Sequence, residues 1–282
     1  MHRIALLVIP ALLLAGCAAT PAVDDSRVHV VASTNVYGSL VEAIGGDLVS
    51  VTSLIDSAAQ DPHSFEASAQ NQLAVSKADL VIENGGGYDD FVDTLLDAAA
   101  SDATVINAAE VTALAPGANE HLWYNLPAMS LVIGEIARQL SELDSDNYQA
   151  YYANADALDA SLRALEDSLR GIGDGKTVAI TEPVPLYLLD LAGFENATPD
   201  EFSEAIEEGT DVPPAVLAET LDGIGSVALL AYNSQTASPE TEQVRAAAEA
   251  AGVPVVEFTE TLPDGEDYIS WMTSNVAALA AR

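Results

Sequence analysis

The stretch Val28-His29-Val30-Val31-Ala32-Ser33-Thr34-Asn35 decides the fold class, because a short β-branched run passes directly into a helical pattern. Apolar residues recur at helical spacing from Val36 to Ile44, and Gly45-Gly46 ends the pattern. A strand followed by a helix is the repeating unit of a parallel sheet, whose strands are joined by crossover helices. The opening of the chain therefore predicts an α/β fold.

The same alternation continues through both halves of the chain. In the first half the patterns predict strands at 49–55, 80–82 and 104–106, and helices at 67–78 and 91–99. In the second half they predict strands at 177–180, 227–231 and 253–256, and helices at 186–192, 213–221, 241–251 and 268–281. We therefore expect two lobes, each with a mostly parallel sheet that helices cover on both faces.

Residues 129–172 differ from both halves, since apolar residues keep helical spacing there and no strand interrupts them. The Asp144-Ser145-Asp146 cluster offers an N-cap for a second helix within this segment. We expect an N-terminal α/β lobe at 28–128, a long rigid connecting helical segment at 129–172, and a C-terminal α/β lobe at 173–282.

The N-terminus has the pattern of an export signal. A weakly cationic start at His2 and Arg3 is followed by an apolar run from Ile4 to Leu14, too short to span a membrane. The run ends in Leu14-Ala15-Gly16-Cys17, which resembles a bacterial lipoprotein signal. This predicts a signal peptide at 1–17, a lipid on Cys17, a tether at 18–27, and a location on the extracellular face of the cell membrane. Cys17 is the only cysteine, which excludes a disulfide within the chain.

The chain is strongly acidic, with 44 Asp and Glu against 9 Lys and Arg and a formal net charge of −35. Nucleic-acid binding needs a basic surface, so the charge argues against it. The same charge disfavours anionic ligands and is compatible with a cation.

Side chains suited to metal binding follow several predicted strands, at the sheet edge where ligands bind in open parallel sheets. His63 lies within Asp61-Pro62-His63-Ser64-Phe65-Glu66, and His121 lies in another loop, Asn119-Glu120-His121-Leu122-Trp123. Glu182 and Glu260 each follow a predicted strand of the second half. Two imidazoles and two carboxylates would neutralise a divalent cation, and this donor set suits Zn²⁺ or Mn²⁺ better than Ca²⁺, Mg²⁺ or Cu⁺. The spacing alone is not a specific motif, and a loop histidine is more often a surface or hydrogen-bonding residue.

Several segments resemble the zinc/manganese solute-binding lipoproteins of bacterial ABC importers, the cluster A-I substrate-binding proteins. The segments that carry the resemblance are 30–35, 44–47, 61–66, 78–81 and 84–88. The resemblance implies that His63 and the His121 of His121-Leu122-Trp123 are metal ligands, with Glu182 as the third and Glu260 as the fourth. The family usually has aspartate at the fourth position. Nearby acids therefore compete with Glu260 for this role: Glu257, Asp264, Glu266 and Asp267.

The resemblance implies a monomeric protein that captures Zn²⁺ or Mn²⁺ between its lobes and delivers it to a membrane permease, without catalysing a reaction. Many zinc-binding members have a histidine-rich loop before the second ligand, whereas residues 107–120 contain no histidine. Zinc nevertheless binds most such sites more tightly than manganese, which leaves the ion open. A zinc hydrolase with a water in place of one ligand is one alternative. A siderophore- or corrinoid-binding protein with the same two lobes is another.

Overall fold

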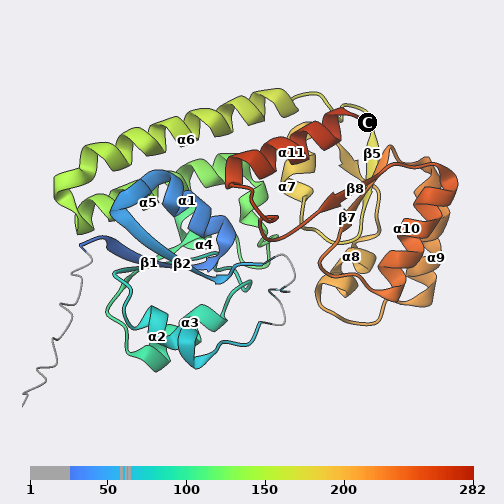
Figure 1. Cartoon of the computed structure of the whole chain (residues 1–282). Helices are drawn as coiled ribbons and strands as arrows, with labels where there is room; N and C mark the ends of the chain where they lie inside the picture. The colour runs from blue at the N-terminus through green and yellow to red at the C-terminus, as the bar shows by residue number, and fades with distance from the viewer. Residues whose placement is uncertain (1–25, 58–59, 61, 63–64) are drawn as a thin grey trace, which may run out of the picture.

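The computed structural model describes residues 26–282 with the exception of 58, 59, 61, 63 and 64. Within these residues the strands form two four-stranded sheets, one in each lobe (Figure 1). The first sheet contains β1 (Val28–Thr34), β2 (Val49–Ile55), β3 (Leu80–Glu83) and β4 (Thr104–Asn107). The second contains β5 (Thr177–Ile180), β6 (Glu195–Asn196), β7 (Leu229–Asn233) and β8 (Val255–Phe258).

Both sheets have the same topology. The strand orders are β2-β1-β3-β4 and β6-β5-β7-β8, and every pairing is parallel. In each sheet the chain first adds a strand on one side of the initial strand and then crosses to the other side. Such a reversal opens a crevice at the carboxyl ends of the strands, where ligands bind in folds of this type.

The central strands are buried on both faces, as the continuous apolar runs predict. In β1, Val30, Val31 and Ala32 are at most 3% exposed, and the apolar residues of β3 are fully buried. The helices of the first lobe are α1 (Asn35–Gly45), α2 (Ala69–Val75), α3 (Phe91–Ala99) and α4 (Ala108–Val111). Those after the connecting segment are α7 (Leu186–Ala192), α8 (Asp200–Glu207), α9 (Pro214–Gly223), α10 (Pro239–Ala251) and α11 (Tyr268–Ala280). The predicted class of two parallel-sheet α/β lobes is confirmed.

The connecting segment consists of two helices, α5 (Leu126–Leu143) and α6 (Tyr148–Leu169). They meet at the predicted break, where the Asp144 carboxylate accepts hydrogen bonds from Asn147 Nδ2 at 2.7 Å and from the Tyr151 hydroxyl at 2.8 Å. The long α6 packs on α1 in the first lobe and on α7 in the second, and Figure 1 shows it spanning the top of the molecule. Of the two helices, α6 therefore joins the lobes directly, since it contacts both.

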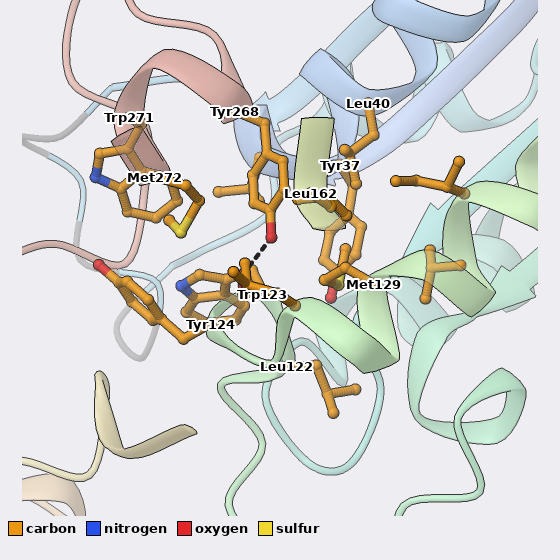
Figure 2. Close-up of a cluster of buried hydrophobic side chains, with 14 of the residues drawn as sticks. Tyr37, Leu40, Leu122, Trp123, Tyr124, Met129, Leu162, Tyr268, Trp271 and Met272 are labelled. Atoms are coloured by element: carbon orange, nitrogen blue, oxygen red, sulfur yellow. Dashed lines mark hydrogen bonds between the residues drawn. The ribbon is translucent and has the colours of Figure 1, made fainter. Parts of the chain in front are cut away.

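An apolar core continues from one lobe to the other beneath α6. It includes Tyr37 and Leu40 of α1, Leu162 of α6, and Trp271 and Met272 of α11 (Figure 2). The opposite face of each sheet has a separate apolar cluster of its own. A hinge motion would have to separate side chains of the shared core, so the packing opposes large movements of one lobe against the other.

The structure differs from the sequence prediction at several elements of the second lobe. Helix α8 and the two-residue strand β6 were not predicted, and β8 lies two residues later than the predicted strand at 253–256. Cys17 and His63 lie outside the described residues. None of the helices within the described residues combines the length and apolar character that crossing a membrane requires.

Candidate metal centre

His121 lies at the end of the segment between α4 and α5, with its side chain fully buried. Its ring packs against Trp123, with ring centres 5.2 Å apart, and edge-on to Tyr88 at 6.0 Å. The Asn119 side-chain oxygen accepts the His121 backbone N–H at 3.1 Å and lies 2.7 Å from Nδ1. An amide oxygen can only accept, so Nδ1 carries the proton and Nε2 is the nitrogen able to bind a metal.

Glu182 follows β5 and is 2% exposed. Its Oε2 accepts hydrogen bonds from Asn233 Nδ2 and from the Thr236 hydroxyl. The Asn233 backbone N–H donates to Thr181 Oγ1 at 2.9 Å, which fixes the end of β7 beside the end of β5. The carboxylate is therefore held at the carboxyl edge of the second sheet.

Glu260 follows β8 and is fully buried. Its Oε1 accepts from Asn233 Nδ2 at 2.8 Å, and its Oε2 accepts from the Tyr88 hydroxyl of the first lobe at 3.3 Å. The Gln235 side-chain oxygen accepts the Glu260 backbone N–H at 2.5 Å and the next backbone N–H at 3.1 Å. Glu260 thus lies at the interface of the lobes, in a loop with a fixed backbone.

The acids that compete with Glu260 in the sequence have other surroundings. Glu257 is exposed and pairs with Arg245 at 3.2 Å, and Asp267 is exposed and caps the first turn of α11. Asp264 is exposed and Glu266 is half-buried. Among these neighbours, burial at the interface therefore favours Glu260.

Tyr88 connects the two halves of the site. Its ring packs on Trp123 at 4.8 Å, beside His121, while its hydroxyl reaches Glu260. Burial, and next the negative charge of Glu260, raise the pKa of Tyr88 well above its ordinary value. The phenol therefore keeps its proton at neutral pH and remains a hydrogen-bond donor.

A tight turn after β3 positions Tyr88. The Asp89 carboxylate accepts the backbone N–H groups of Asn84 at 2.7 Å and of Gly85 at 2.8 Å. Gly85 has a φ of +70°, and a side chain there would collide with Asn107. Asn84 Nδ2 also donates to the Glu120 carbonyl at 2.9 Å, so the turn is tied directly to the segment that carries His121.

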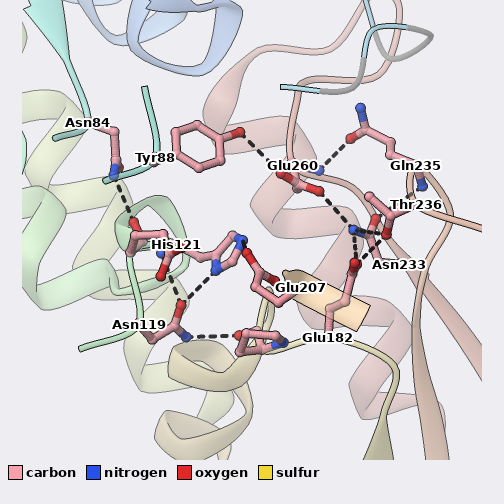
Figure 3. A network of polar contacts seen from close by, with 12 residues as sticks. Asn84, Tyr88, Asn119, His121, Glu182, Glu207, Asn233, Gln235, Thr236 and Glu260 are labelled. Carbon is pink, nitrogen blue, oxygen red and sulfur yellow. Dashed lines mark hydrogen bonds and ion pairs between the residues drawn. The ribbon is translucent and has the colours of Figure 1, made fainter. Parts of the chain in front are cut away.

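At the facing edges of the two sheets, polar contacts join two of the sequence-predicted ligands, Glu182 and Glu260, through Asn233 (Figure 3). A third, His121, lies beside them and touches this group through the ring of Tyr88, whose hydroxyl donates to Glu260. The fourth, His63, lies outside the described residues. Among the residues that the structure describes, no three His, Cys, Asp or Glu side chains lie close enough together to form a metal site by themselves. Instead, the Asn233 amide nitrogen lies between the carboxylates of Glu182 and Glu260 and donates to both.

Sequence reasoning missed another carboxylate at this location. Glu207, the last residue of α8, places its Oε1 3.6 Å from His121 Nε2, and its side chain is 13% exposed. The first-turn acids Asp200 and Glu201 after Pro199 are a helix-start signal that could have revealed α8.

Comparisons with known proteins agree on one family. The family described as ZnuA, zinc-uptake complex component A, periplasmic, matches residues 30–282. The manganese-binding lipoprotein MntA of Halalkalibacterium halodurans is 28% identical over 235 residues, which are 74% of this chain and 78% of that protein. The iron ABC transporter substrate-binding lipoprotein MtsA of Streptococcus pyogenes is 26% identical over 237 residues, 73% of this chain and 76% of that protein.

Solved structures agree with the sequence relatives. The substrate-binding protein FpvC of Pseudomonas aeruginosa in complex with Mn²⁺ superposes with a TM-score of 0.74 at 27% identity, covering 90% of this chain and 97% of that chain. The periplasmic zinc-binding protein TroA of Treponema pallidum shares the fold, with a TM-score of 0.74 at 18% identity over 90% of this chain and 98% of that chain.

These matches support neither a hydrolase nor a siderophore- or corrinoid-binding protein. The match to the family covers both lobes and the helices that join them. The chain therefore belongs to the zinc-uptake complex component A family, the non-enzymatic, metal-binding substrate-binding proteins of ABC importers.

Proposed function

We propose that the protein binds one Zn²⁺ or Mn²⁺ ion between its lobes through His63, His121, Glu182 and Glu260, and releases it to a membrane permease. Two neutral imidazoles and two carboxylates neutralise a divalent ion, which limits the cost of burying it. The relative MntA is named as manganese-binding, and FpvC was solved with Mn²⁺. His63 enters the proposal from the Asp-Pro-His segment of the sequence.

One observation carries this proposal. Two buried carboxylates, Glu182 and Glu260, accept from the same Asn233 nitrogen, and Tyr88 links Glu260 to the ring of His121. Burying two carboxylates side by side is costly unless positive charge or strong donors compensate them. A divalent cation at this location would provide that charge.

The remaining parts of the proposal follow from the sequence and the relatives. Cys17 would carry a lipid that holds the protein on the outer face of the cell membrane, as the relatives named lipoproteins suggest. We also propose that the mature protein is a monomer. Its parts would be a tether at 18–27, lobes at 28–128 and 173–282, and the connecting segment at 129–172.

Calorimetric titration of the metal-free protein with Zn²⁺ and Mn²⁺ tests the ligand set. We expect one ion per chain, and we expect His121→Ala and Glu182→Ala each to lower the affinity by more than about 100-fold, the upper range for residues that only support a ligand. His29→Ala is the matched histidine control, because His29 lies within β1 rather than at its carboxyl end. Unchanged affinity in His121→Ala, or an equal loss in His29→Ala, would contradict the assignment.

A further inference from the structure

Glu207 faces Nε2 of His121, the ring nitrogen that does not carry the proton. Nδ1 is engaged by the Asn119 side-chain oxygen, and Glu207 Oε1 lies 3.6 Å from Nε2. Glu207 comes from α8 of the second lobe, whereas His121 belongs to the first. The contact therefore joins one residue of each lobe, as an ion bound between the lobes would do.

The separation of these two atoms fits donors that share one ion. Metal–nitrogen and metal–oxygen bonds to imidazole and carboxylate are about 2.0–2.2 Å long. Two such donors are about 3.0–3.6 Å apart when the angle at the ion lies between about 90°, as in octahedral coordination, and roughly 120°. From this geometry we propose that Glu207 is a further carboxylate donor to the ion, an inference that rests on the metal-binding function proposed above.

A cavity beside the centre could supply water to an ion bound at Glu207. The cavity has a volume of about 560 Å³ and lies between the 206–211 segment and the 235–240 segment. Glu182 and Glu207 both contribute to its wall, so it reaches two of the carboxylates of the centre. A water molecule needs about 30 Å³, and the cavity therefore has room for several waters that could complete the coordination of an ion at Glu207.

A third carboxylate changes which ion the site prefers. Zn²⁺ in proteins is usually four-coordinate, whereas Mn²⁺ favours six ligands and oxygen donors. With Glu207 the centre would offer three carboxylates beside His121, and water from the cavity could bring the number of donors above four. Glu207 therefore raises the affinity for Mn²⁺ relative to Zn²⁺.

Competition titrations of Mn²⁺ and Zn²⁺ against a chelator, on the purified full-length protein, test this role. Glu207→Gln keeps the shape of the side chain and removes its charge, and we expect it to weaken Mn²⁺ binding by about tenfold or more and Zn²⁺ binding less. Glu207→Asp keeps the charge but shortens the side chain. If Glu207 acts by direct contact, this variant weakens Mn²⁺ binding to a similar extent.

The control is Glu208→Gln, since Glu208 is exposed, lines the same cavity and loses the same charge. We expect its affinities to equal those of the unmodified protein. The role of Glu207 is refuted if Glu207→Gln leaves the Mn²⁺ affinity unchanged or lowers the affinities for Mn²⁺ and Zn²⁺ equally. It is also refuted if Glu207→Asp binds Mn²⁺ as tightly as the unmodified protein does, or if Glu208→Gln weakens Mn²⁺ binding as much as Glu207→Gln does. Those outcomes leave the metal-binding function intact, whereas an unmodified protein that binds neither ion would refute the function itself.

Discussion

The two lobes share one strand order, yet they hold their halves of the candidate centre by different means. In the first lobe His121 is packed between aromatic rings, and the side-chain oxygen of Asn119 holds the imidazole proton on Nδ1. In the second lobe Glu182 and Glu260 are embedded among side-chain donors, with Asn233 donating to both.

The difference follows from the charge of the ligand. A neutral imidazole can be buried against apolar rings at little cost, provided that one nitrogen has a hydrogen-bond partner. A buried carboxylate loses far more hydration and must be given several donors. The same topology therefore delivers ligands to the facing edges of both sheets, but the chemistry of each ligand dictates its support.

The largest effect that this comparison predicts is on the stability of the second lobe. Asn233→Leu removes the donor shared by two buried carboxylates, and we expect the free energy of unfolding of the metal-free protein to fall by about 3 kcal/mol. Denaturant unfolding monitored by circular dichroism measures this loss. Added Mn²⁺ or Zn²⁺ should recover part of it, because an ion bound to the folded state stabilises that state. A metal-free variant as stable as the parent would show that the carboxylates do not depend on Asn233.

The positions next to strand ends were the predictable part of the site. Glu182 follows β5 closely enough that the rule for parallel sheets selects it from the sequence. The same rule could have selected Asn233, the last residue of β7, but the β-branched and apolar pattern ends at Ala231 and left Asn233 in the loop. Glu207 could not be found in this way, because it ends a helix and reaches the centre only through the packing of α8.

The predictable part of the fold was likewise set by burial. Strands such as β3 are short, fully buried apolar runs, and they were predicted to within one residue. Helix α8 has its buried residues Phe202, Ser203 and Ala205 among acids, which gives a weak apolar pattern. Strand β6 has only two residues and is defined by its pairing with β5, so no pattern in the sequence around it could predict it.

A smaller effect is expected from the neutral half of the centre. Asn119→Ala frees the His121 ring to adopt the other tautomer and removes the bond from Asn119 Nδ2 to the Pro183 carbonyl of the second lobe, 2.9 Å long. We expect metal affinity to fall by about 10- to 100-fold, the usual range for a partner that orients a metal-binding histidine. Calorimetric titration measures it.

Asn119→Asp separates the two contributions of Asn119. It keeps an acceptor for Nδ1–H but cannot donate to Pro183, so an affinity close to that of the parent would assign the effect to the tautomer. An Asn119→Ala protein with unchanged affinity would contradict the role of Asn119 in orienting His121.

The smallest effect concerns buried acids of the first lobe that support the site without belonging to it. Glu83, at the end of β3, is 4% exposed, and its Oε1 accepts from Asn107 Nδ2 at 2.7 Å. Burial, and next the charge of Asp89, raise the pKa of Glu83 from its ordinary 4.5 to about 7. Between these two values the folded state binds more protons than the unfolded state at this residue, so its contribution to stability falls as the pH rises through that window.

Glu83→Gln should remove this penalty while retaining an oxygen that accepts from Asn107. We expect the variant to be more stable than the parent by about 1–2 kcal/mol at pH 8, because it removes the penalty of an ionised, buried carboxylate whose pKa is raised. At pH 4 the two proteins should be equally stable, since Glu83 is then largely protonated in both the folded and the unfolded parent.

Denaturant unfolding at a series of pH values tests this, and a stability difference that stays constant from pH 4 to pH 8 would show that Glu83 does not titrate with a raised pKa. Because the variant leaves the ligands unchanged, its metal affinity at neutral pH should match the parent's, which separates support of the first lobe from the centre itself.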